Sequence, residues 1–197
     1  MDTKDKGFNT KMVHAGASKD VYGSAVVPIY QTSTFAFESA QNGADGFAGR
    51  ADGYIYTRIG NPTIRALERS IAELERGAEG IATSAGMGAV NVVYMTVLGQ
   101  GTHMVSTASV YGPSRGLAER YYSRFGVEST FVDTSNLANV QAALRANSKL
   151  VYLESPSNPA MLVTDIRAVS DLAHRAGCVV AVDNTFASPY LQRPLDL

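Results

Sequence analysis

The chain has 197 residues, of which 45% are hydrophobic and 18% are charged, and its formal net charge is −1. This near-neutral charge gives no electrostatic reason to expect a nucleic acid or an anionic membrane as a partner. The single cysteine, Cys178, excludes an internal disulfide and favours a reducing, cytoplasmic compartment. The polar start (MDTKDKGFNTK) lacks the apolar core of a signal peptide, and the longest apolar helix-like stretch is too short to cross a bilayer.

Residues 1–60 show little hydrophobic periodicity and mix glycine, serine, threonine and aromatic residues, as in VYGSAVVPIYQTSTFAF. A long irregular segment of this kind is typically functional or packed on a partner. The pattern becomes regular at Asn61, which precedes Pro62 as a helix cap. Leu67, Ile71 and Leu74 then recur at helical spacing and predict a helix up to about residue 76.

Strands and helices alternate through the rest of the chain. The predicted strands are GIAT, HMVST, STFVDT, KLVYLES and CVVAVD, at residues 80–83, 103–107, 129–134, 149–155 and 178–183. The predicted helices between them cover residues 84–98, 112–125, 136–146 and 166–177. Several strands are nearly continuous apolar runs, which is typical of a sheet with both faces covered. We therefore expect an α/β fold of three layers with a mostly parallel sheet.

In parallel α/β sheets, ligands bind at the carboxyl ends of the strands. Ser84 to Gly88 is a run of small residues between the first predicted strand and a helix, where backbone N–H groups can bind phosphate. The alternative is an ordinary tight turn. Asn91 stands where a dinucleotide-binding fingerprint has its third glycine, which disfavours a nicotinamide-dependent enzyme.

Polar side chains follow the later strands. Tyr111 could stack on a planar ring or transfer protons, or be a half-buried aromatic at a turn. Asn158 lies in the proline-stiffened loop ESPSNP, which could also be a simple rigid turn. Asp183 ends a buried strand, which is costly unless a cation such as a protonated cofactor ring pairs with it. A helix cap or a distant salt bridge is the alternative for Asp183. Arg58 is either a surface charge or part of a phosphate site.

The remaining chemistry-bearing residues are expected to be structural. His14, His103 and His174 are scattered without the spacing of metal ligands, so we predict no metal site. Cys178 opens an apolar strand and is expected to be a packed thiol.

Over nearly its full length the chain resembles the Cys/Met-metabolism enzymes that use pyridoxal phosphate. The matching stretches are VPIYQTSTFAF, YIYTRIGNPT, SAGMGAV, VYG, ESPSNP and VDNTFASPYLQRPLDL. The family includes methionine γ-lyase, cystathionine γ-lyase, cystathionine γ-synthase and O-acetylhomoserine sulfhydrylase. The resemblance implies fold type I architecture, of which this chain would be the N-terminal portion, and a homotetramer built from two tight dimers.

The resemblance also implies which residues hold the cofactor phosphate. The backbone N–H groups of Gly86 and Met87 would bind it within the same subunit. Tyr56 and Arg58 would reach the phosphate of the neighbouring subunit, so residues 1–60 would be an arm that contributes to that subunit.

Residues 61–197 would form the cofactor-binding α/β domain, incomplete at its C-terminal end. By the resemblance, Tyr111 would be the catalytic residue: it would stack on the pyridine ring and handle protons while the γ-substituent leaves. Asn158 would lie near the 3′-oxygen of the ring, and Asp183 would bind its nitrogen.

Within the family, DGFAGRADGYIYTRIGNPT and SPYLQRPLDL look most like methionine γ-lyase. That resemblance implies an amino-acid substrate and α,γ-elimination, which converts methionine to methanethiol, 2-oxobutanoate and ammonia. Pro113 stands where many such lyases have cysteine and where cystathionine γ-lyases and γ-synthases tend to have glycine. Cystathionine γ-lyase, cystathionine γ-synthase and O-acetylhomoserine sulfhydrylase therefore stay as alternatives.

The family binds its cofactor as a Schiff base on a lysine in a Ser-x-Thr-Lys-type motif. None of the five lysines in this sequence lies in such a motif. We expect that lysine to lie outside the given sequence, beyond Leu197, either because the chain is a fragment or because the sequence is interrupted at a modified lysine. The alternative from another class is a non-catalytic fragment that lacks the Schiff-base lysine.

Overall fold

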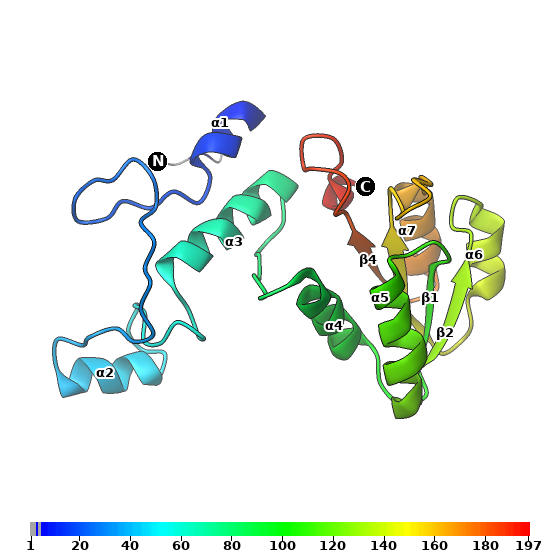
Figure 1. Cartoon of the computed structure of the whole chain (residues 1–197), viewed down its shortest axis with the longest axis horizontal. Coiled ribbons are helices and arrows are strands. Elements are labelled where there is room, and N and C mark those ends of the chain that lie inside the picture. Colours follow the sequence, from blue (N-terminus) through cyan, green and yellow to red (C-terminus); the bar gives the residue numbers. More distant parts are fainter. Residues whose placement is uncertain (1–2, 4) are drawn as a thin grey trace. The chain divides into compact units, whose positions relative to one another are not determined.

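The computed structural model describes residue 3 and residues 5–197. The chain divides into two compact units, one ending at Ala82 and the other spanning Thr83–Leu197. Figure 1 shows the elements of both units in chain order.

The described residues of the first unit form the helices α1 (Phe8–His14), α2 (Ala40–Phe47) and α3 (Pro62–Glu75). Helix α3 confirms the predicted helix, and the side chain of Asn61 caps it by accepting a hydrogen bond from the Thr63 N–H. The sequence did not predict α1 and α2. They are only seven and eight residues long, and the glycines at positions 43 and 46 weaken the helical signal of α2.

The predicted strand at residues 80–83 is wrong, because this segment is irregular. Ile81 is 81% exposed, and the N–H of Ala82 donates to Oε1 of Glu68 rather than to a neighbouring strand. Among the described residues no strand pairs with this segment, and a strand needs a partner to satisfy its backbone.

The second unit contains a four-stranded parallel sheet in the order β2-β1-β3-β4. The strands are β1 (His103–Thr107), β2 (Glu128–Val132), β3 (Ser148–Glu154) and β4 (Val179–Asp183). These ranges confirm the four later strands that the sequence predicted. Parallel strands have their carboxyl ends at the same edge, so Glu154 and Asp183 end neighbouring strands side by side.

Helical segments connect these strands. They are α4 (Gly86–Val97), α5 (Gly112–Gly116), the π-helical turn η1 (Leu117–Tyr121), the 3₁₀ turn η2 (Tyr122–Phe125), α6 (Leu137–Ala143), α7 (Ile166–Arg175) and the 3₁₀ turn η3 (Pro194–Asp196). The predicted helix over 112–125 is thus helical throughout, but it consists of an α-helical, a π-helical and a 3₁₀ segment in succession. The described helices do not include one that is long and apolar enough to span a membrane.

Two hydrophobic clusters cover the two faces of the sheet. Side chains alternate along a strand, so Leu150 and Tyr152 of β3 face one cluster, whereas Val151 and Leu153 face the other. The first cluster includes residues of α4, and the second includes residues of α6 and α7. Helices on both faces of a parallel sheet confirm the three-layer α/β prediction.

Two residues that were expected to be structural lie in this core. His103 is fully buried, and its ring nitrogens lie 2.8 Å from the hydroxyls of Ser148 and Thr130. Cys178 is buried in the second cluster, where burial raises the pKa of its thiol. No group of three or more His, Cys, Asp or Glu residues that could hold a metal ion occurs in the described part of the chain.

Candidate functional site

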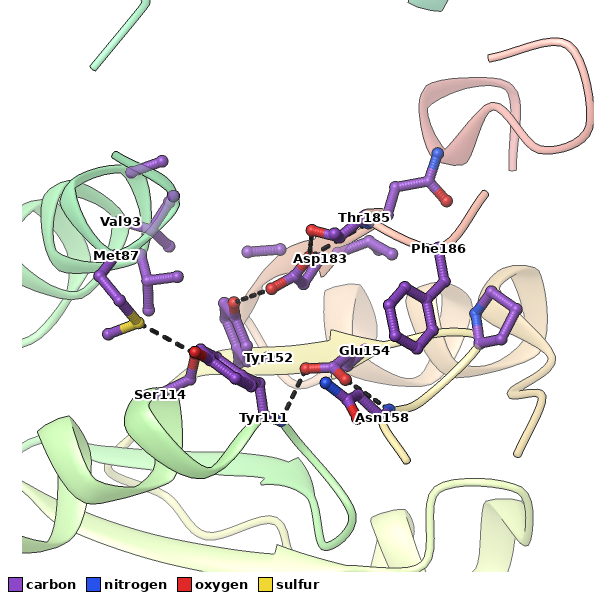
Figure 2. Close-up of a pocket in the computed structure, with 17 residues that line it drawn as sticks. Met87, Val93, Tyr111, Ser114, Tyr152, Glu154, Asn158, Asp183, Thr185 and Phe186 are labelled. Atoms are coloured by element: carbon purple, nitrogen blue, oxygen red, sulfur yellow. Dashed lines mark hydrogen bonds between the residues drawn. The ribbon is translucent and has the colours of Figure 1, made fainter. Parts of the chain in front are cut away.

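A cavity of about 390 Å³ opens in the second unit where β3 and β4 end and α4 begins. Small-molecule sites commonly fall in the range of roughly 300–1,000 Å³. Five residues predicted from the sequence line it together: Gly86, Met87, Tyr111, Asn158 and Asp183. Figure 2 shows how the side chains of Met87, Tyr111, Asn158 and Asp183 surround this space.

The N-terminus of α4 presents free backbone donors to the cavity. Helix hydrogen bonding starts with the N–H groups of Gly88 and Ala89, which both donate to the Ala85 carbonyl oxygen. The alanine at the cap position offers no side-chain acceptor, so the N–H groups of Gly86 and Met87 have no partner among the described residues. A Cβ added to Gly86 would meet nothing within 4 Å, so open space lies beside these donors. The helix dipole and the two N–H groups favour an anion here.

Asp183 contributes a carboxylate at the end of β4. Its Oδ1 atom accepts hydrogen bonds from the Thr185 N–H at 3.2 Å and the Thr185 hydroxyl at 2.5 Å. Its Oδ2 atom accepts one from the Tyr152 hydroxyl at 3.1 Å (Figure 2). No lysine, arginine or histidine forms an ion pair with Asp183 in the described chain. One lone pair of Oδ2 therefore stays available for a cationic group in the cavity.

Tyr152, which donates to Asp183, belongs to a cluster of aromatic rings in edge-on contact. Its ring contacts Tyr94 edge-on, with centroids 5.2 Å apart, and Tyr94 contacts Tyr122 in the same way at 5.6 Å. Burial raises the pKa of Tyr152, and the charge of Asp183 raises it further, so the hydroxyl stays protonated and donates. The sequence predicted Tyr152 only as part of an apolar strand.

Glu154 is a second carboxylate that the sequence analysis did not single out. It pairs in register with Asp183 and is 4% exposed. Burial raises the pKa of its carboxyl group, whereas hydrogen bonds from two backbone N–H groups lower it and the charge of Asp183 raises it further. The sequence does contain a pattern that could have identified Glu154, because KLVYLE ends an apolar run in a carboxylate just as CVVAVD does.

The side chains of Tyr111 and Asn158 face the cavity without fixed partners. Tyr111 is 44% exposed, and within the described residues neither its hydroxyl nor the Asn158 amide group makes a hydrogen bond. Figure 2 shows both side chains beside Glu154. A side chain that has no protein partner in a cavity is free to contact a ligand.

Tyr56 and Arg58 lie in the first unit and are not part of this cavity. The guanidinium carbon of Arg58 lies 4.9 Å from the centroid of the Tyr56 ring. Tyr56 also forms an isolated antiparallel bridge with Thr34. Their predicted role toward a neighbouring subunit stays a prediction.

The residues present fit a planar molecule that carries a phosphate and a protonated ring nitrogen. One part of the wall offers the free N–H groups of α4, another offers the Asp183 carboxylate, and Val90 and Val93 supply apolar surface. Tyr111 lines the same space and could stack on an aromatic ring. The described lysines are absent from the lining.

Comparison with known proteins gives a consistent result. The family model for Cys/Met metabolism PLP-dependent enzymes matches residues 9–197. The L-methionine gamma-lyase of Fusobacterium nucleatum is 50% identical over all of this chain, which covers 50% of that protein. The cystathionine gamma-lyase of Bacillus subtilis is 43% identical over 95% of this chain, which covers 48% of that protein. The chain thus spans about half the length of the curated relatives it matches.

Among solved structures, the crystal structure of metB from Corynebacterium glutamicum superimposes with a TM-score of 0.91. It is 43% identical in sequence and matches all of this chain, which covers 49% of that structure.

Proposed function

Because this chain belongs to the Cys/Met metabolism PLP-dependent enzymes, we propose that it supplies the cofactor-binding part of a carbon–sulfur lyase of that family. The parallel sheet with helices on both faces agrees with fold type I architecture. The proposed reaction is the α,γ-elimination of methionine to methanethiol, 2-oxobutanoate and ammonia.

One observation carries this proposal. The carboxylate of Asp183, which has no cationic partner among the described residues, and the free N–H groups at the start of α4 line the same cavity. The N–H groups of Gly86 and Met87 would bind the phosphate of pyridoxal phosphate, and Asp183 would hold its ring nitrogen protonated. When bound, this cofactor supplies an electron sink for the bonds at the substrate's α-carbon.

The other residues of the cavity would orient the cofactor and move protons. Tyr111 would stack on the ring, and its hydroxyl would give a proton to the departing thiolate sulfur. The Asn158 amide would donate to the ring's 3′-oxygen. Val93 and Phe186 supply apolar surface to the same cavity and would help to exclude water.

The first unit would complete the site in an oligomer. We propose that residues 1–60 reach the neighbouring subunit, where Tyr56 and Arg58 hold the cofactor phosphate, and that residues 61–197 carry the α/β domain. The working enzyme would be a cytoplasmic homotetramer of two tight dimers. The lysine that carries the cofactor would be supplied by sequence outside these 197 residues.

Product analysis of the holoenzyme tests the reaction. Methionine should give methanethiol, 2-oxobutanoate and ammonia in equal amounts without added sulfide. Turnover of O-acetylhomoserine only when sulfide is present would overturn elimination in favour of the sulfhydrylase reaction.

The 43% identity to a cystathionine gamma-lyase supports one competing substrate. Faster release of cysteine from cystathionine than of methanethiol from methionine would favour that assignment. Formation of cystathionine from cysteine and an O-acylhomoserine would instead favour the γ-synthase.

A non-catalytic role is tested by mass and absorbance. Pyridoxal phosphate held by its lysine should give a visible absorbance band that the free protein lacks. An intact mass that matches the 197 residues, without that band, would favour a non-catalytic fragment.

A further inference from the structure

Glu154 joins two loops that lie far apart in the sequence. Its Oε2 atom accepts a hydrogen bond from the backbone N–H of Tyr111 at 2.8 Å. Its Oε1 atom accepts one from the backbone N–H of Asn158 at 2.6 Å. Tyr111 follows β1 and Asn158 follows β3, so one carboxylate fixes two loops at the carboxyl edge of the sheet (Figure 2).

At Tyr111 and Asn158 the backbone is held by a hydrogen bond, but the side chain is not. Both backbones are held by Glu154, whereas both side chains line the cavity without a hydrogen-bond partner in the described chain. We call the two hydrogen bonds from the backbone N–H groups of Tyr111 and Asn158 to Glu154 the clamp. The clamp determines where each side chain projects and leaves its functional group free for a ligand.

Only a carboxylate meets this requirement at position 154. Two N–H donors converge on the side chain, and an ionised carboxylate offers one acceptor oxygen to each. A glutamine would turn an NH₂ group toward one of these donors and lose that bond. Charge-assisted hydrogen bonds are also stronger than neutral ones, which offsets part of the cost of burying this group.

Glu154 and Asp183 differ in whether their carboxylate oxygens can still contact a ligand. Both oxygens of Glu154 are engaged by backbone donors and the residue is 4% exposed, whereas Asp183 keeps a lone pair toward the cavity. Glu154 is therefore suited to hold other residues rather than to contact the ligand through its charge.

From this geometry we propose that Glu154 is a positioning residue, which sets the places of the Tyr111 ring and the Asn158 amide around the cofactor. This inference rests on the proposed function, because it assigns pyridoxal phosphate as the ligand of the cavity. Glu154 acts through the two loops and takes no part in the proton transfers.

The first test requires no cofactor. In Glu154→Gln, amide hydrogen exchange should become faster at Tyr111 or Asn158, and it should stay as in the unaltered protein along β1 and α7. Unchanged exchange at both amides would overturn the proposal, whether or not the protein binds pyridoxal phosphate.

The second test uses the holoenzyme. Glu154→Gln should weaken the affinity for pyridoxal phosphate about tenfold, the equivalent of one lost charge-assisted hydrogen bond. It should also change the circular dichroism of the bound cofactor, which reports how the ring lies against its neighbours. An unaltered affinity and spectrum would overturn the proposed positioning.

Ser155→Ala is the matched control. The Ser155 hydroxyl is also fully buried and accepts a backbone N–H, that of Thr164 at 3.1 Å, but it holds neither Tyr111 nor Asn158. This variant should lose stability without changing the cofactor spectrum. An equal spectral change in Ser155→Ala would reduce the role of Glu154 to general loop stability and overturn the proposal.

The outcomes separate this inference from the proposed function. An unaltered protein that does not bind pyridoxal phosphate would refute the function, while the exchange experiment still decides the clamp. If Glu154→Gln does not fold, Glu154→Asp is the second variant, since its shorter side chain reaches at most one of the two amides. In the unaltered protein both amides must exchange slowly, and rapid exchange at either one contradicts the clamp.

Discussion

The hydroxyl of Tyr152 donates a hydrogen bond to Oδ2 of Asp183 across 3.1 Å, from the neighbouring strand and on the same face of the sheet. Oδ2 is also the atom with a lone pair left for the cavity, so Tyr152 shares it with any bound cation. A donor on this oxygen withdraws charge from it and weakens its attraction for a cation in the cavity. Tyr152 is thus placed to adjust how strongly Asp183 stabilises a protonated ring nitrogen.

Tyr152→Phe should raise the pH at which the absorbance of the bound cofactor changes, because Asp183 then stabilises a protonated ring more strongly. The lost buried hydrogen bond should lower the free energy of unfolding by about 1 kcal/mol. A spectral pH titration and urea denaturation measure the two effects.

Tyr122→Phe is the matched control for Tyr152→Phe. In the unaltered protein, the hydroxyl of Tyr122 donates to Oδ1 of Asn91 at 3.0 Å within the same aromatic cluster and does not contact Asp183. It should cost stability and leave the spectral titration unchanged. The same pH shift in both variants would argue against the role of Tyr152.

Asp183→Asn should lower the rate of turnover on the order of 100-fold, a loss typical of removing one preorganised electrostatic contact. The amide has nearly the same size but no charge to keep a ring nitrogen protonated. Steady-state kinetics and equilibrium binding of pyridoxal phosphate should both show the loss. Near-normal turnover would refute the proposed pairing.

Asp133→Asn provides the comparison for Asp183→Asn. Asp133 comes directly after β2, and its Oδ1 accepts hydrogen bonds from the N–H and hydroxyl of Ser135, as Asp183 at the end of β4 does from Thr185. It does not line the cavity. This substitution removes the same kind of turn bond and should leave kinetics and cofactor affinity unaltered.

Tyr111→Phe should keep the affinity for pyridoxal phosphate and lower turnover by about 100-fold or more, because the ring still stacks but the proton donor is lost. Tyr121→Phe, at an exposed tyrosine outside the cavity, should change neither. Full activity in Tyr111→Phe, measured by methanethiol release, would remove the hydroxyl from the mechanism.

Gly86→Ala should separate stability from binding. Alanine reduces the freedom of the unfolded chain and meets no atom within 4 Å, so the free energy of unfolding should rise by up to about 1 kcal/mol. The same methyl group would project beside the free N–H groups, so phosphate-dependent cofactor affinity should fall. Gly116→Ala also meets open space but lies outside the cavity, and it should change stability alone.

His103 should make stability depend on pH. Burial lowers the pKa of His103 below its ordinary value of 6.5, so the unfolded chain binds more protons in mildly acidic solution. Stability is therefore fully present above about pH 6.5 and should be lost as the pH falls below it. Urea denaturation at several pH values should show this loss in the unaltered protein and a smaller slope in His103→Gln. Equal slopes would contradict this source of the dependence.

Local patterns in the sequence predicted most of the second unit. The alternation of apolar strands with helices depends on neighbouring residues and can be read without a structure. The same holds for Asp183 at the end of an apolar strand. Residues 80–83, which span the boundary between the two units in the sequence, are apolar enough for a strand but have no partner strand among the described residues. Whether a segment becomes a strand depends on what lies beside it.

The sequence by itself thus determined the order of the strands and helices from α4 to β4, the layered α/β class and five residues that meet in one cavity. Only the tertiary structure decided which polar groups support them: Glu154 under Tyr111 and Asn158, and Tyr152 under Asp183. The physical reason is the separation in the sequence between the residues that interact. Periodicity and caps involve residues within a few positions, whereas these hydrogen bonds follow from which strands pair, in which register and on which face of the sheet.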